Sequence, residues 1–135
     1  MASGKWVGYI LVVKNNYMLQ LSHKDLQVYK IALQFLKEIY SVTDTFPKQE
    51  QFGLISQIRR AAVSVCSNIA EGASRKSKAE KRRFYEVSRS SLVEIDTQLE
   101  IAILLAFYKK EQNSSMEQNM LSVFRILSKM IDNLG

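Results

Sequence analysis

Apolar side chains recur at steps of three and four residues along most of the chain, and this spacing restricts the possible fold more than any other feature. The first such run begins near Leu26 and the last one ends near Ile131. These steps return a side chain to the same face of an α-helix, whereas a half-buried strand alternates at every second residue. One proline and five glycines in 135 residues are also too few for the many turns of a sandwich or barrel. The sequence therefore predicts an all-α chain.

Breaks in this pattern divide it into helices. Ser22 is a candidate N-cap for the first helix, which is expected to end before Pro47 because proline disfavours helical backbone in the preceding residue. Pro47 can open the second helix, and Gly72 supplies a stop near its end. In the first helix the expected core line is Leu26, Tyr29, Leu33, Leu36 and Tyr40, widened by Ala32, Phe35 and Ile39. In the second helix it is Ile55, Ile58, Ala62, Val65 and Ile69.

Two capping boxes predict the starts of the remaining helices. In each, a serine is expected to accept a hydrogen bond from the amide of a glutamate three residues later, whose carboxylate reaches back. Ser77 and Glu80 form the first box, and the third helix is expected to continue to about Tyr108. Ser114 and Glu117 form the second box, which opens the fourth helix.

Four amphipathic helices joined by short connections predict an antiparallel up-down four-helix bundle over residues 22–135. Residues 1–21 are expected to be a separate N-terminal extension, which is either not native to the protein, a disordered tail, or a short strand that attaches to a neighbouring molecule. The apolar stretch Trp6–Val13 is shorter than a membrane span and lacks the cleavage pattern of a signal peptide. A cytoplasmic protein without a membrane partner is therefore expected.

Residues that could carry chemistry are few. The single cysteine, Cys66, lies in an apolar run and is expected to be a small buried hydrophobe, so neither an internal disulfide nor a cysteine metal cluster is available. The single histidine, His23, is expected to be exposed in the first helical turn. We find no glycine-rich phosphate loop, metal-ligand spacing or nucleophile elbow in the sequence. We predict no enzyme activity, no catalytic residues, no metal and no cofactor.

Charge is concentrated in one segment. Between residues 59 and 89, nine basic residues oppose three acidic ones, and this net charge of +6 equals the formal net charge of the whole chain. Such a surface attracts the phosphate backbone of a nucleic acid, and it would also attract an anionic membrane or an acidic protein. A merely solvated turn remains an equal alternative. The candidate nucleic-acid-binding residues are Arg75, Lys76, Lys78, Lys81, Arg82, Arg83 and Arg89, and Arg59 and Arg60 are either an extension of this patch or structural.

A polar seam follows the second and third helices. Its members are Gln57, Ala61, Ser64, Asn68 and Glu71, and then Ser88, Ser91, Glu94 and Gln98. The seam is either a network inside the bundle, with Arg59 or Arg60 pairing with Glu94, or a contact with another subunit whose register it sets. A catalytic site at Asn68, Glu71 and Glu94 lacks an activated nucleophile and is disfavoured.

Several of these motifs resemble those of the four-helix-bundle family of 23S rRNA intervening sequence proteins. They are Phe46-Pro47, Gln57-Ile58-Arg59-Arg60-Ala61-Ala62-Val63-Ser64, Ser67-Asn68-Ile69-Ala70-Glu71-Gly72, Arg83-Phe84 and Ser91-Leu92-Val93-Glu94. The resemblance covers about residues 22–133 and departs at Ser90, where such sequences usually have glycine.

This family is similar in turn to the accessory variability protein of diversity-generating retroelements, a barrel-like pentamer that binds nucleic acid and its reverse transcriptase. The resemblance therefore implies a homo-oligomer, with a pentamer as the expected form. Together with the charge pattern, it leads us to expect a non-enzymatic protein that binds the phosphate backbone of structured RNA or an RNA–DNA duplex. The alternative is an adaptor for a protein such as a reverse transcriptase, with a basic patch that only solubilises.

Overall fold

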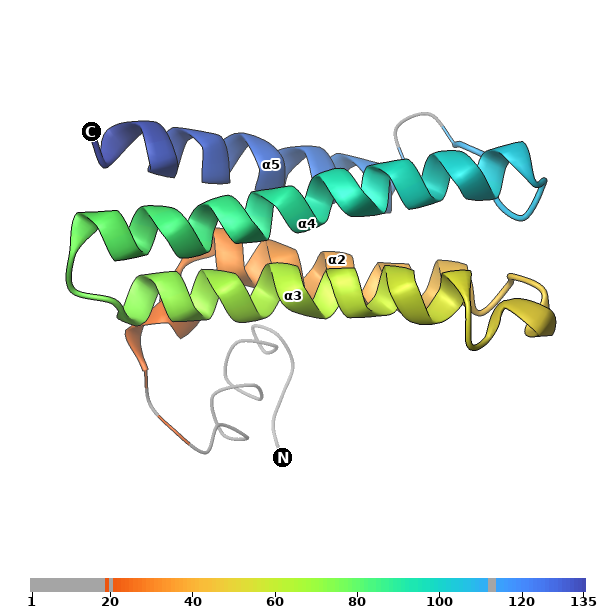
Figure 1. The fold of residues 1–135 in the computed structure, drawn as a ribbon, viewed down its shortest axis with the longest axis horizontal. Coiled ribbons are helices and arrows are strands. Elements are labelled where there is room, and N and C mark those ends of the chain that lie inside the picture. Colours follow the sequence, from red (N-terminus) through yellow and green to blue (C-terminus); the bar gives the residue numbers. More distant parts are fainter. Residues whose placement is uncertain (1–18, 20, 112–113) are drawn as a thin grey trace.

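Four α-helices and two short 3₁₀ helices make up the computed structural model, which describes residue 19, residues 21–111 and residues 114–135 (Figure 1). The expected N-terminal extension thus falls almost entirely outside the described residues. In chain order the elements are η1 (Ser22–Asp25), α2 (Gln27–Thr43), η2 (Lys48–Glu50), α3 (Leu54–Ser74), α4 (Lys78–Leu104) and α5 (Ser115–Asn133). The described ranges contain no strand.

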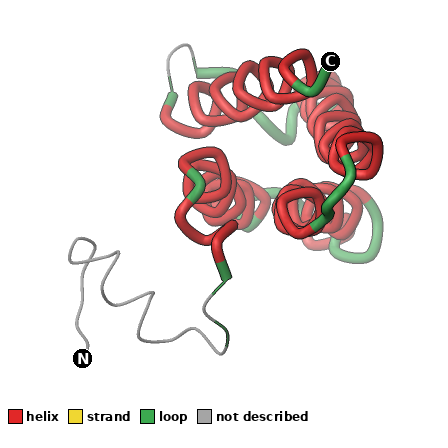
Figure 2. The backbone as a smooth tube through the Cα atoms, turned by 90° about the vertical axis from the view of Figure 1, so that its left-hand side faces the viewer, coloured by secondary structure: helices red, strands yellow, loops and turns green. Residues whose placement is uncertain are grey.

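The four helices occupy the corners of a square when the molecule is viewed along their axes (Figure 2). Each helix packs against the next one along the chain, and α2 also packs against α5, which closes the square. Successive helices run in opposite directions because only short connections join them. The predicted antiparallel four-helix bundle is confirmed.

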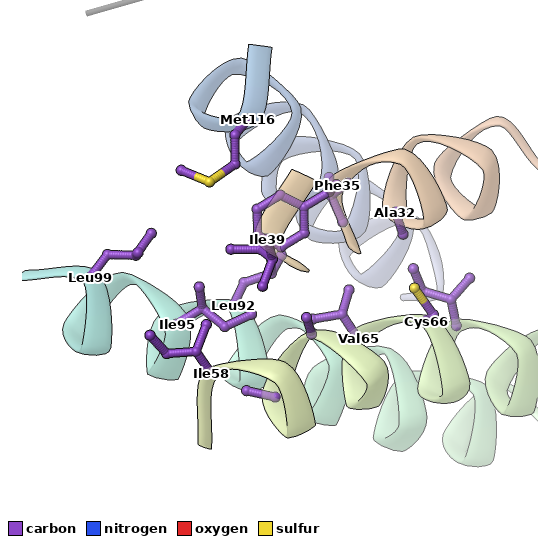
Figure 3. Close-up of a cluster of buried hydrophobic side chains, with 14 of the residues drawn as sticks. Ala32, Phe35, Ile39, Ile58, Val65, Cys66, Leu92, Ile95, Leu99 and Met116 are labelled. Atoms are coloured by element: carbon purple, nitrogen blue, oxygen red, sulfur yellow. The ribbon is translucent and has the colours of Figure 1, made fainter. Parts of the chain in front are cut away.

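The core lies along the axis of this bundle. Figure 3 shows Phe35 and Ile39 of α2 approaching Ile58 and Val65 of α3 and Ile95 of α4, and all five side chains are fully buried. In α3 the whole predicted core line is buried. In α2 the buried residues include those expected only to widen the stripe, whereas Leu26, Tyr29, Leu33 and Leu36 are partly buried and Tyr40 is exposed. Two apolar stripes lie side by side on this helix, and packing against α3 and α5 selects between them.

The first two helices begin later than predicted. Ser22 lies in η1, and α2 follows only after Leu26, whose extended backbone separates the two helices. Pro47 precedes η2, and α3 begins after Gly53, whose φ of −114° and ψ of −110° are not helical. The Glu50 carboxylate then accepts a hydrogen bond from the Leu54 amide at 3.2 Å, which satisfies one of the free amides at the start of α3.

Gly72 was predicted to stop the second helix, but it lies inside α3 and has a packing role. A Cβ atom at this position would lie 2.6 Å from Cε1 and 2.7 Å from Cδ1 of Tyr85 on α4. The Tyr85 ring is buried, so it has little room to move away. The absence of a side chain at Gly72 therefore permits the close approach of α3 and α4.

Helix α4 ends at Leu104, before the predicted end near Tyr108. Ala106 adopts a φ of 63°, in the left-handed region that glycine usually occupies at helix ends. The Phe107 amide donates to the Ala102 carbonyl at 2.8 Å, and the Ala106 amide donates to the Ile103 carbonyl at 3.0 Å. These are the two hydrogen bonds of a Schellman motif, which the sequence did not reveal because no glycine marks it.

Replacing Gly72 by alanine is expected to destabilise the bundle. Replacing an exposed helical glycine by alanine usually raises the free energy of unfolding by up to about 1 kcal/mol. Here, however, the new methyl group would collide with Tyr85, and overpacking of this kind lowers the free energy of unfolding by about 1–3 kcal/mol. We therefore expect urea denaturation to give a lower free energy of unfolding for Gly72→Ala. The exposed Ser67→Ala on the same helix is the control and should be nearly neutral. A more stable Gly72→Ala would contradict the close contact.

The opposite replacement, Ala106→Gly, is expected to stabilise the protein. A left-handed backbone costs an L-residue about 1–2 kcal/mol, and glycine avoids this cost while retaining both hydrogen bonds of the motif. Part of the gain is offset by the greater freedom of glycine in the unfolded chain, which leaves about 0.5–1 kcal/mol. Thermal unfolding followed by circular dichroism would show a higher midpoint, and an unchanged or lower midpoint would contradict the assigned conformation.

Candidate nucleic-acid interface

The turn between α3 and α4 brings the end of one helix beside the start of the next (Figure 1). Arg75 leaves α3 with an extended backbone, and its amide donates to the Gly72 carbonyl at 3.2 Å. Ser77 then caps α4, because its Oγ accepts from the Glu80 amide at 3.1 Å as predicted. The positive end of the α4 dipole thus lies at the turn.

Three of the predicted nucleic-acid-binding residues donate hydrogen bonds within the protein. Lys81 Nζ donates to the carbonyls of Ala73 at 3.1 Å and Gly72 at 3.4 Å, where it closes the end of α3. Arg75 forms an ion pair with Glu71, one turn earlier on α3. Arg89 donates to Ser128 Oγ on α5 at 3.1 Å, away from the turn.

The other four candidates are Lys76, Lys78, Arg82 and Arg83, and we call them the basic turn. Lys76, Lys78 and Arg83 are exposed, Arg82 is partly buried, and within the described part of the chain none of the four forms an ion pair. Their charges are therefore available to an external anion.

The nearby Phe84 ring offers little to a nucleic-acid base. The guanidinium carbons of Arg75 and Arg83 lie 4.8 Å and 5.3 Å from its centroid. The ring is already engaged in two cation–π contacts. The basic turn is therefore suited to contacts with phosphates and much less to base stacking.

The predicted pairing of Arg59 or Arg60 with Glu94 is wrong. Arg59 instead forms an ion pair with Asp44 at 2.9 Å, and its Nε donates to Thr43 Oγ1 at 2.8 Å. Arg60 is exposed, and Glu94 only accepts a long 3.4 Å hydrogen bond from the Gln98 amide group. The arginine partner was missed because Asp44 lies 15 residues away in a helix-ending turn, where no periodic pattern marks it.

Part of the predicted polar seam lies between α3 and α4. Ser91 Oγ donates to Ser64 Oγ at 2.9 Å, and the Asn68 side-chain amide donates to the Ser64 carbonyl at 2.9 Å. Ser88, which is fully buried, donates to the Val65 carbonyl at 2.8 Å. The outer members Gln57, Glu71 and Glu94 are exposed. The small seam residues thus connect two helices of one subunit.

The two residues most often associated with reactivity are both buried. Burial raises the pKa of the Cys66 thiol to about 12, so the nucleophilic thiolate is scarce at neutral pH. His23 was expected to be exposed, but it is buried and contacts the Tyr29 ring edge to face at 4.8 Å. Burial and the charge of Lys24 lower the pKa of His23. Among the described residues, no group of three potential ligands is placed to hold a metal ion.

Glu117 joins α5 to the loop that follows α4. Its carboxylate accepts hydrogen bonds from the Tyr108 hydroxyl at 2.6 Å, Lys110 Nζ at 2.8 Å and the Glu111 amide at 3.2 Å. Ser114 caps α5 as predicted by accepting from the Glu117 amide at 3.2 Å, but the carboxylate turns to the loop and does not complete the capping box. Burial alone would raise the pKa of Glu117, and the hydrogen bonds from Lys110, Tyr108 and Glu111 lower it on balance.

The structure defines the class of this protein as an up-down four-helix bundle with a cation-rich turn between its second and third helices. The chain belongs to the family of 23S rRNA-intervening sequence proteins, whose family model matches residues 24–129. The predicted family membership is thereby confirmed.

A solved structure shares the fold. It is a protein of unknown function from the S23 ribosomal protein family of Bacteroides thetaiotaomicron, with 23% sequence identity and a TM-score of 0.69. The similarity covers 78% of this chain and 95% of that one. A comparison with curated proteins gave no match. Among the described helices, none combines the length and apolar character that crossing a membrane requires.

Replacing Glu117 by glutamine should lower the free energy of unfolding at neutral pH. It should also make that free energy less dependent on pH in the acidic range. The pKa of Glu117 is lower in the folded protein than in the unfolded chain, so its stabilising effect is complete above the unfolded value and is lost as the pH falls through the folded value. We expect Glu117→Gln to lower the free energy of unfolding by about 1–2 kcal/mol at neutral pH, and the difference from the unmodified protein should shrink on acidification.

Urea denaturation over a pH series below neutrality measures this difference. The exposed Glu86→Gln on α4 serves as the matched control, since it removes the same charge without a hydrogen-bonded cluster. A difference that stays constant down to the most acidic pH would show that the charge of Glu117 is not what stabilises the loop.

Proposed function

We propose that this protein is a non-enzymatic nucleic-acid-binding protein that contacts phosphate backbones through the basic turn. The observation that carries the proposal is the group of four cations, Lys76, Lys78, Arg82 and Arg83, without ion-pair partners in the described structure. Each phosphate that a cation neutralises releases counterions, which favours binding at low salt. The adjacent start of α4 contributes further positive potential.

Structured RNA or an RNA–DNA duplex is the nucleic acid that we propose as the ligand. Arg75 and Arg83 already contact the Phe84 ring, so the turn favours recognition of backbone shape over stacking on bases. Duplexes that contain RNA present such a shape, with base edges poorly accessible in a narrow major groove.

We also propose that several copies assemble, so that the basic turn is repeated around an oligomer. Repetition would convert a weak contact into a much tighter one by avidity. The exposed outer seam residues Gln57, Glu71 and Glu94 are available for a contact between subunits. The pentameric form rests on the resemblance to the accessory variability protein alone, and light scattering would measure the subunit number.

A protein-binding adaptor is the second candidate function, and the groove between α4 and α5 favours it. The apolar side chains Val93, Leu121 and Phe124 are exposed along this groove, and Asp96 contributes to its lining. A neighbouring cavity of about 470 Å³ continues it and adds Glu100. An apolar groove with an acidic rim suits a basic protein partner better than a nucleic acid.

The triple variant Lys76→Glu, Lys78→Glu and Arg83→Glu should weaken binding to RNA hairpins and RNA–DNA duplexes of different sequence alike. We expect a loss of at least about tenfold at low salt, together with a salt slope that is shallower by about one for each cation lost. Fluorescence anisotropy over a salt series measures both quantities. Lys81 is left unchanged because it also closes the end of α3.

The matched control reverses three exposed lysines outside the basic turn, Lys37, Lys109 and Lys129. The control has the same net charge as the triple variant, so equal losses in both would place the effect in overall charge and contradict a site at the turn. Binding that does not depend on salt would also contradict it. If the unmodified oligomer binds no nucleic acid even at low salt, the adaptor becomes the better account.

A further inference from the structure

A second cationic surface lies toward the other end of α3 from the basic turn. It is a groove of about 460 Å³ between α2 and α3, lined mainly by Tyr40, Phe52, Ile55, Arg59, Arg60 and Val63. We call it the aromatic groove. Its chemistry differs from that of the basic turn because one aromatic side chain, Phe52, is almost fully exposed.

Phe52 is the most exposed large apolar side chain in the described structure. Its ring is 91% exposed and lies in the short connection between η2 and α3. Such a ring contributes almost nothing to the core, and leaving it in water is unfavourable. Phe52 is therefore free to contact a ligand without any rearrangement of the bundle.

The opposite part of the groove is held rigidly. The guanidinium carbon of Arg59 lies 4.4 Å from the centroid of the Tyr40 ring, which is 41% exposed. Hydrogen bonds to Thr43 Oγ1 and the Tyr40 carbonyl and the ion pair with Asp44 fix the guanidinium in place. A planar ligand thus meets a surface that is already ordered, which reduces the entropy lost on binding.

The groove retains positive charge. No acidic side chain contributes to its lining, and Asp44 neutralises only Arg59. Arg60 is exposed and has no ion pair in the described part of the chain. An accessible aromatic ring, here Phe52, beside a cation without an ion pair is a combination by which proteins bind single-stranded nucleic acid.

We propose that the aromatic groove binds an unpaired nucleotide of RNA, with its base stacked on Phe52 and its phosphate contacting Arg60. This inference rests on the proposed function and makes it more specific. Arg60 and Ser74 are 14 residues apart along α3, so about 21 Å of helix separates the groove from the start of the turn. A single RNA molecule can reach both, with a duplex at the basic turn and an unpaired segment in the groove.

The variant Phe52→Ala tests the proposal with three RNA probes. These are a blunt hairpin, the same hairpin with a short single-stranded tail, and the tail alone with a fluorescent aminopurine base. We expect Phe52→Ala to weaken binding of the tailed hairpin about tenfold and to leave the blunt hairpin unchanged. Quenching of the aminopurine on binding reports stacking and should be lost in the variant.

Leu104→Ala is the matched control, because Leu104 is an apolar side chain that is 83% exposed and lies near the end of α4. Arg60→Gln should weaken binding of the tail and make it less dependent on salt. Phe52→Ala should fold normally because the ring is exposed, and circular dichroism checks this.

The other possible outcomes distinguish nucleotide binding in the aromatic groove from phosphate binding at the basic turn. If the blunt hairpin binds but the tail adds nothing, or if both alanine variants behave alike, the groove proposal is overturned and the proposed function stands. If only the single strand binds and the binding depends on Phe52, the groove is supported and the basic turn is not. Binding of none of the probes overturns both. A smaller oligomer for Phe52→Ala in light scattering would assign Phe52 to a subunit contact and overturn the nucleotide site.

Discussion

The close contact between α3 and α4 is the packing interaction on which the position of the basic turn depends. The Tyr85 ring occupies the space that a side chain at Gly72 would need, and Ser88 donates from α4 to the Val65 carbonyl of α3. The three residues Arg75 to Ser77 join the two helices on the same side of this contact. The turn then holds its cations on a fixed backbone, with the start of α4 directed toward the same region. A bulkier contact would separate the helix ends and disperse this charge.

The sequence predicted the number of helices, the core line of α3 and both capping serines, because these features depend on local periodicity and on neighbouring residues. The sequence-based predictions were wrong where a residue's role depends on a contact with a distant part of the chain, or where no characteristic residue type marks the conformation. Gly72 reads as a helix stop, and its packing role depends on Tyr85, which lies on another helix. Ala106 adopts, at the end of α4, the left-handed conformation that is usually found at glycine. In α2, only the tertiary packing decides that Tyr40 faces outward.

The basic segment shows why a net charge predicts a surface and does not identify its contacts. The count of +6 is correct, yet Lys81 is directed to backbone carbonyls at the end of α3, which carry no signature in the sequence. Arg89 reaches Ser128, 39 residues away, and Arg59 reaches Asp44 in an earlier turn. Cations that satisfy helix ends and distant hydroxyls stabilise the fold. The four cations of the basic turn, for which the described structure gives no ion pair, would provide the charge for a ligand.

The two cationic surfaces would contribute different properties to RNA binding. Phosphate contacts at the basic turn would depend strongly on salt and would not distinguish bases. They would therefore supply affinity without selecting a particular position along the RNA. Stacking on Phe52 requires a base that is out of a helix, so the aromatic groove would select unpaired nucleotides. Because about 21 Å of helix lies between Arg60 and Ser74, the two contacts can be made together only by an RNA with the matching separation of duplex and single strand. The combination would therefore recognise the shape of a junction, with the length of one helix setting the selectivity.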